Sequence, residues 1–181
     1  MWPWGHVAVG YLLYSGWRRL RGEGRPSGIA AVAVAVGAVL PDLVDKPLAW
    51  WFVVLPTGRT LAHSLLFVVP VVGVLWWVAG DRHADAVSAT ALGWLSHLAA
   101  DGIGASPAYL GYLLWPATTT PPYPTEQSFS AHVAEIEMTP FFLAQLGLVA
   151  LAGVVWHRDG RPGLAVVRNG LARTLGAAPS E

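Results

Sequence analysis

Long apolar segments that carry almost no charge are the feature that most constrains how this chain can fold. The clearest is residues 60–79, TLAHSLLFVVPVVGVLWWVA, which contain no Asp, Glu, Lys or Arg. Residues 139–156 have the same character. A helix that crosses a bilayer needs about 20 mostly apolar residues. Both segments therefore predict helices that span a membrane.

Three further segments extend this pattern. Residues 86–103 are long enough to span but carry His97 and Asp101, whereas residues 4–17 and 26–40 are shorter. At about 1.5 Å per residue the two shorter segments reach only about 22 Å, so they span if flanking residues snorkel or the bilayer thins. We therefore expect about five spans.

Two more apolar pieces, residues 48–55 and 108–115, are too short to cross a bilayer, and their Trp and Tyr residues suit its headgroup boundary. The predicted fold class is thus all-α: a polytopic transmembrane helix bundle of about five spans, plus short re-entrant or interfacial segments.

The composition agrees with a membrane protein and excludes other classes. Of the 181 residues, 54% are hydrophobic and only 12% are charged, against about 25% charged in a typical soluble domain. A chain this small cannot bury that much apolar surface away from water. Lys and Arg total 11, as do Asp and Glu, so no basic field exists to hold nucleic acid. The expected partner is the lipid bilayer.

The basic residues predict the orientation. Most of them follow the first, third and fifth expected spans: Arg18, Arg19, Arg21, Arg25, Arg82, Arg158, Arg161, Arg168 and Arg173. The positive-inside rule makes that side cytoplasmic. We therefore expect a multi-pass protein of the cell (plasma or inner) membrane, with its N-terminus outside. Residues 1–157 form a single transmembrane domain in this interpretation, and residues 158–181 form a basic, loosely ordered cytoplasmic tail.

Polar residues from separate segments are predicted to gather near the outer ends of the spans. They are His6, Asp42, Asp45, His63, His97 and Asp101. Ionisable groups at membrane depth are costly and usually functional. His97 and Asp101 are four residues apart, so they share one helix face. The structural alternatives are a histidine bonded to a backbone carbonyl, a turn or cap at Asp42, and an inert hydrogen bond between helices.

These residue types favour a metal site. Imidazole and carboxylate together suit Zn²⁺, Mn²⁺ or Fe²⁺. Three histidines and three aspartates exceed what one tetrahedral ion needs, so either one or two divalent ions, most simply Zn²⁺, are expected. Asp45 is predicted either to bind the metal directly or to hydrogen-bond to another metal ligand and so orient it.

The ordered motifs resemble a known family. They are GH at residues 5–6, PDLVD at 41–45, Arg59 with AHS at 62–64, HLAAD at 97–101 and LLWP at 113–116. This combination is similar to the YdjM-like integral membrane proteins, a family described as membrane-bound metal-dependent hydrolases. The chain departs from the family pattern at Gly58, where His is frequent, at Ala62, where Thr is frequent, and in the spacing of Asp42 and Asp45. The resemblance implies a His- and Asp-rich site like those of zinc-dependent phospholipases C and nucleases.

The predicted function is a metal-dependent hydrolase, phosphoesterase-like or phospholipase C-like, at the outer membrane face. A metal lowers the pKa of bound water toward about 7, and Asp45 or Glu135 would accept the proton. Arg59 would clamp a phosphate oxygen. The depth of the site favours a lipid or another amphiphile as substrate. The alternatives are a non-hydrolytic metal-binding or ion- or proton-transporting membrane protein, and a structural or partner-binding one.

Overall fold

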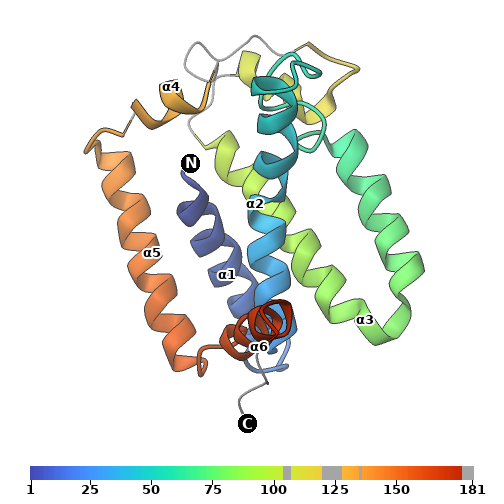
Figure 1. Ribbon diagram of the computed structural model, residues 1–181, viewed down its shortest axis with the longest axis vertical. Helices are drawn as coiled ribbons and strands as arrows, with labels where there is room; N and C mark the ends of the chain where they lie inside the picture. The colour runs from blue at the N-terminus through green and yellow to red at the C-terminus, as the bar shows by residue number, and fades with distance from the viewer. Residues whose placement is uncertain (104–106, 120–127, 135, 177–181) are drawn as a thin grey trace.

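The computed structural model describes residues 1–103, 107–119, 128–134 and 136–176. Within those residues the chain is all-helical and contains no strand, which confirms the predicted fold class (Figure 1). The elements in chain order are α1 (Pro3–Leu20), α2 (Gly28–Trp50), α3 (Leu65–Gly102), the 3₁₀ helix η1 (Pro107–Leu114), α4 (Phe129–Ala134), α5 (Pro140–Arg158) and α6 (Leu164–Thr174).

Helix α3 folds back on itself at Gly80. This residue adopts φ 57° and ψ −171°, a left-handed conformation that glycine reaches without a Cβ clash. Residues 65–79 and 81–102 therefore form two limbs that meet at a sharp turn (Figure 1), and they correspond to the third and fourth expected spans. In the described chain three helices, α2, α3 and α5, are long and apolar enough to cross a membrane. With α3 counted as two limbs and α1 beside them, the arrangement agrees with about five spans.

Helix α2 differs from the expected span 26–40. It continues through Pro41 and Pro47 to Trp50, which gives it 23 residues. Each internal proline removes one backbone hydrogen bond, but the helix persists because Asp42, Asp45 and Lys46 of this turn are buried against neighbouring elements. The apolar piece expected at 48–55 is therefore split between the end of α2 and the loop that follows it.

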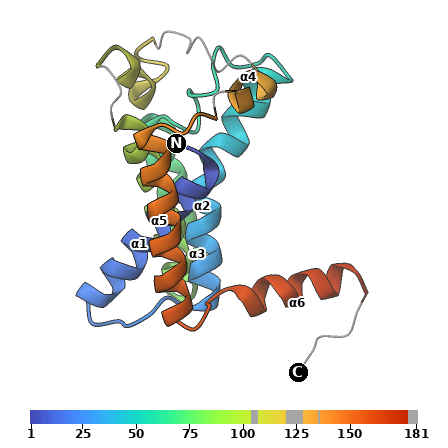
Figure 2. The ribbon, with the colours of Figure 1, turned by 90° about the vertical axis from the view of Figure 1, so that its left-hand side faces the viewer.

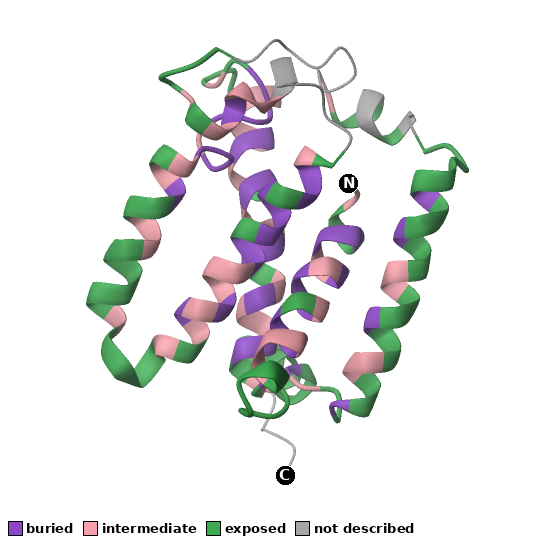
Figure 3. Ribbon diagram, turned by 180° about the vertical axis from the view of Figure 1, so that it is seen from behind, coloured by how far each residue is buried: buried purple, intermediate pink, exposed green. Residues whose placement is uncertain are grey.

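The core lies where α2, α1 and the second limb of α3 cross (Figure 3). A Cβ added at Gly37 would collide with the carbonyl of Thr90, and one at Gly93 with the carbonyl of Val34. Small residues let two helix backbones approach this closely. The crossing lies about one turn below Asp42 and His97, so it sets the distance between these side chains.

The periphery of the bundle is apolar and exposed. Trp77 and Val69 on the first limb of α3, and Leu143 and Leu151 on α5, are all more than half exposed (Figure 3). Such faces suit lipid chains, which are as apolar as leucine.

The C-terminal part leaves the axis of the bundle. Helix α6 extends sideways from the end of α5 (Figure 2) and has no buried residue. It lies within the predicted cytoplasmic tail, whose last residues, 177–181, are outside the described residues. The prediction that this tail is loosely ordered stays a prediction.

Candidate metal centre

The structure brings all six predicted metal-binding residues to one end of the bundle, beside the N-terminus. His6 lies on α1, Asp42 and Asp45 on α2, and His63 just before α3. His97 and Asp101 lie on the second limb of α3. None of the six is more than 8% exposed. The sequence pattern therefore identified a real cluster in space.

Hydrogen bonds fix the tautomers of two of the histidines. His97 Nδ1 lies 2.7 Å from the carbonyl oxygen of Ala38. A carbonyl only accepts, so this nitrogen donates. His63 Nδ1 lies 2.8 Å from Asp45 Oδ2 and donates to it in the same way. Both rings therefore keep an unprotonated Nε2 when neutral, and these two atoms are 3.1 Å apart.

Asp45 is saturated by the loop that precedes α3. Its Oδ1 accepts from the backbone N–H of Ala62 at 2.9 Å. Its Oδ2 accepts from the N–H of Thr60 at 2.9 Å, from the N–H of His63 at 3.3 Å and from the His63 ring. Two roles were predicted for Asp45, namely binding the metal directly and orienting another metal ligand. Because its oxygens already bond to the loop and to His63, the geometry matches the orienting role.

Asp42 and Asp101 face the two histidine nitrogens from opposite helices. Asp42 Oδ1 lies 3.7 Å from His63 Nε2 and 3.8 Å from His97 Nε2. Asp101 Oδ2 lies 3.8 Å from each of the same nitrogens. Among the described residues, Asp42 Oδ1 is buried without a hydrogen-bond partner. One oxygen of each carboxylate therefore lies within 4 Å of both histidine nitrogens.

His6 completes the cluster from α1. Its ring stacks on His97 with a centroid separation of 3.7 Å. Its Nε2 lies 3.2 Å from Asp101 Oδ1, but among the described residues neither ring nitrogen has a partner with hydrogen-bond geometry. Buried polar atoms are normally bonded, so the unsatisfied atoms of His6 and Asp42 make this cluster a candidate ligand site.

Three cationic groups compensate the carboxylates. Lys46 Nζ lies 2.9 Å from Asp42 Oδ2. Arg59 Nε lies 2.9 Å from Asp101 Oδ2, and the amino group of Met1 lies 2.9 Å from Asp101 Oδ1. Buried charges persist when they are paired in this way. Arg59, predicted to hold a substrate phosphate, therefore lies at the site and also contacts a candidate ligand.

Two overlapping groups of these residues could hold a metal ion. They are His6, Asp42 and His97, and His63, His97 and Asp101, with all ligand atoms of a group within 4.8 Å of one another. Both groups need His97, whose Nδ1 is engaged by Ala38. One imidazole nitrogen has one lone pair, so it serves a single ion.

Lys46 is the site residue that sequence reasoning missed. Its position four residues after Asp42 is the usual spacing of an ion pair on a helix, so the sequence did contain a signal for it.

Trp94 was also missed. Its Nε1 donates to the carbonyl of Ala62 at 2.7 Å and holds the loop beside His63. Glu135, predicted as a proton acceptor, lies outside the described residues.

Comparison with known proteins gives one match. The family model described as YdjM inner membrane protein matches residues 1–175. No curated protein and no solved structure matches the chain.

Proposed function

The chain belongs to the YdjM inner membrane protein family. From its buried His and Asp cluster, we propose that it is a membrane-embedded hydrolase that uses a divalent metal ion. Its substrate is a phosphoester or another amphiphile, taken at the outer face of the membrane. The proposal concerns the cluster of His6, Asp42, His63, His97 and Asp101.

The observation that best supports this proposal is the 3.1 Å separation of His63 Nε2 and His97 Nε2. Their partners at Nδ1 leave both atoms as acceptors, and two facing lone pairs repel each other unless a cation lies beside them. Four ligands about 2.0–2.2 Å from one ion in a tetrahedron are about 3.4 Å apart. The distances from these nitrogens to Asp42 and Asp101, 3.7–3.8 Å, lie close to that value.

One ion held by His63, His97 and Asp101 is the simplest arrangement, and Asp42, whose Oδ1 lies 3.7–3.8 Å from both histidine nitrogens, would supply the fourth ligand. Two histidines and two carboxylates suit Zn²⁺ best, with Mn²⁺ or Fe²⁺ as alternatives. When bound, such an ion would polarise a phosphoester and make a nearby water molecule more acidic.

The remaining side chains have distinct roles in this proposal. Asp45 holds the His63 ring so that Nε2 points to the donors. His6 accepts the proton of the attacking water, because its ring nitrogens are unsatisfied and it stacks on His97. Hydrolysis would consume one water molecule, form a P–O bond to it and break the P–O bond to the leaving alcohol. Arg59 places a positive charge next to Asp101, where the phosphate would lie.

An outer location is supported by the arrangement of charge. The cluster lies at the end of the bundle that carries the N-terminus, and the Gly80 turn, the α1–α2 loop and α6 lie at the other end (Figure 1). Nine of the ten arginines lie in or beside those three segments, and the positive-inside rule directs them to the cytoplasm. The loop beside the site exposes Trp51, Phe52, Val53 and Val54, each at least 68% exposed. Such a surface suits an amphiphilic substrate.

The first test is the metal content of the purified protein by elemental analysis. We expect about one Zn²⁺ per chain in the wild type, and a loss in His97→Ala and in Asp42→Ala. His83→Ala, an exposed histidine at the opposite end, is the matched control. Equal, metal-free preparations of all four proteins would refute the metal site.

The second test separates a hydrolase from a metal-binding protein. Chelated wild-type protein is assayed on phospholipid vesicles before and after Zn²⁺ is restored, with release of the headgroup as the readout. Recovery of turnover in the wild type but not in His97→Ala supports the hydrolase. Full metal occupancy without release of any phosphoester would instead favour the non-hydrolytic alternative.

A further inference from the structure

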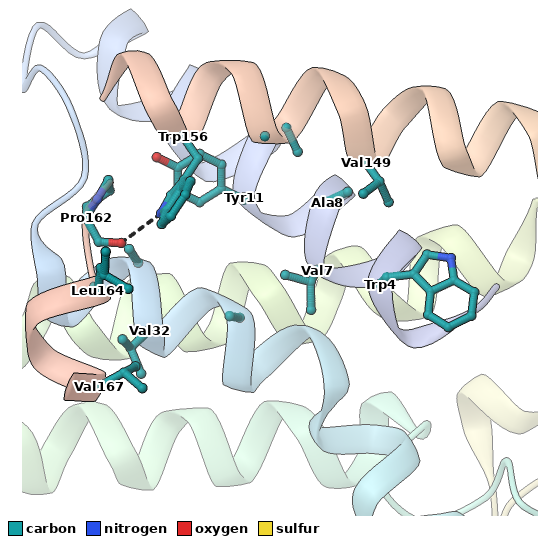
Figure 4. A pocket seen from close by; sticks show the side chains of 15 residues that line it. Trp4, Val7, Ala8, Tyr11, Val32, Val149, Trp156, Pro162, Leu164 and Val167 are labelled. Atoms are coloured by element: carbon teal, nitrogen blue, oxygen red, sulfur yellow. Dashed lines mark hydrogen bonds between the residues drawn. The ribbon is translucent and has the colours of Figure 1, made fainter. Parts of the chain in front are cut away.

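A second feature lies on the other side of α1 and takes no part in the metal cluster. It is an elongated groove of about 600 Å³ between α1, α2 and α5, closed at one end by the start of α6 (Figure 4). Trp4 lies at the open end, beside the first turn of α1, and Leu164 and Val167 lie at the α6 end. We call it the apolar groove.

The lining of the apolar groove is mostly aliphatic and aromatic, and the polar side-chain atoms of Tyr11 and Trp156 are already hydrogen-bonded. The Tyr11 hydroxyl donates to Asp159 at 2.7 Å, and Trp156 Nε1 donates to the carbonyl of Pro162 at 2.9 Å (Figure 4). Water needs two or more polar partners to occupy a cavity. A hydrocarbon occupant fits this lining better.

The dimensions also fit a chain rather than a compact ligand. The groove follows α1 from Trp4 to Tyr11 and α5 from Val149 to Trp156, and at about 1.5 Å per residue each stretch is about 10 Å long. Its volume lies within the range of about 300–1,000 Å³ that ligand sites occupy.

Positive charge gathers where the apolar groove meets α6. Arg25, Arg158, Arg161 and Arg168 are exposed there, and none of them forms an ion pair with a carboxylate among the described residues. Arg25 lies against the turn before α6, since a Cβ at Gly160 would be 3.3 Å from its Nη1. The carboxylate of this turn, Asp159, is buried and already bonded to Tyr11, Ser15 and Arg19.

We propose that the apolar groove binds one anionic phospholipid of the surrounding membrane. One acyl chain fills the groove, and the phosphate lies against the arginines at its α6 end. Helix α6 points away from the bundle axis (Figure 2), and its exposed residues Leu164, Val167 and Leu171 share one face, whereas the exposed Arg173 lies on the opposite face. That is the pattern of a helix lying in the headgroup layer, which would put the arginines at phosphate depth.

The acyl chain is tested by filling the groove. Gly153 lines it, and a Cβ there meets nothing within 4 Å, so Gly153→Leu adds bulk without a clash. Gly147 on the same helix has equally open surroundings and does not line the groove, so Gly147→Leu is the matched control. Native mass spectrometry of detergent-solubilised protein then counts retained phosphatidylglycerol. We expect at least about a tenfold loss of the lipid-bound form in Gly153→Leu only. Equal retention in both variants would overturn the proposal.

The headgroup is tested with two lipids that share the same acyl chains. Phosphatidylglycerol should bind more tightly than phosphatidylcholine. Arg25→Gln and Arg168→Gln should each reduce that preference about fivefold, because a basic residue near an anionic surface contributes about 1 kcal/mol. Arg82→Gln, at the Gly80 turn, should leave the preference unchanged. Equal binding of the two lipids by the wild type would overturn the assignment of an anionic headgroup.

Discussion

Aspartate is buried at both ends of the bundle, but the hydrogen bonding of the buried carboxylates differs between the two ends. At the α6 end, Asp159 accepts from Tyr11 at 2.7 Å, from Ser15 at 2.9 Å and from Arg19. At the opposite end, Asp42 Oδ1 and both nitrogens of His6 have no hydrogen-bond partner among the described residues, and two histidine nitrogens face each other. A fully bonded carboxylate ties helices together, whereas unsatisfied donor atoms around one point indicate a ligand site. The comparison separates a fully bonded structural cluster from the candidate metal centre.

The largest expected effect is on stability at the structural end. Asp159→Ala leaves the buried hydroxyls of Tyr11 and Ser15, and the half-exposed Arg19, without their acceptor, so the free energy of unfolding should fall by about 3 kcal/mol. Unfolding in mixed detergent micelles measures this change. The metal content should equal that of the wild type, and a loss of metal in this variant would contradict the separation of the two ends.

The second largest expected effect is on metal binding at the candidate metal centre. Asp42→Asn keeps the volume of the side chain but replaces a carboxylate oxygen with a weaker amide ligand for the metal. The affinity for Zn²⁺ should therefore fall by more than about 100-fold, which exceeds the loss expected when a group that only orients a ligand is removed. Competition with a fluorescent chelator measures it. Asp81→Asn, an exposed carboxylate beside the Gly80 turn, serves as control. An unchanged affinity in Asp42→Asn would remove this residue from the proposed ligand set.

Asp45→Asn should have an intermediate effect. The Asp45 carboxylate bonds to Nδ1 of His63 and does not face the Nε2 atoms of the two histidines. Loss of such an orienting partner weakens metal binding about 10–100-fold. The same chelator competition applies. A loss larger than that of Asp42→Asn would mean that Asp45 is itself a ligand.

The smallest effect is expected for Tyr14→Phe. The Tyr14 hydroxyl bonds to Asp85, which also pairs with Arg18 and Ser27. Removing one of these donors should cost about 0.5–1.5 kcal/mol of unfolding free energy and leave metal content unchanged. A cost as large as that of Asp159→Ala would show that this contact, too, is a principal tie between helices.

Much of the site was predictable because its signals are local. His97 and Asp101 share a helix face by their spacing, and the proximity of His6, Asp42 and His63 follows from the ends of the expected spans. Which of its two predicted roles Asp45 takes was not predictable, since that depends on how the loop before α3 folds back onto α2. The continuation of α2 past Pro41 was missed for a similar reason: burial of Asp42, Asp45 and Lys46 outweighs the hydrogen bonds lost at the prolines.

The sequence by itself determined that the chain is a helical membrane protein, that all its arginines except Arg59 lie at one end and that its His and Asp cluster lies at the other. Hydropathy and charge act segment by segment, so no tertiary contact is needed for these properties. Only the tertiary structure decided which atoms are left without partners. That outcome depends on the close crossing of α2 and α3 at Gly37 and Gly93, which brings His97 to the carbonyl of Ala38 and so leaves its Nε2 facing His63.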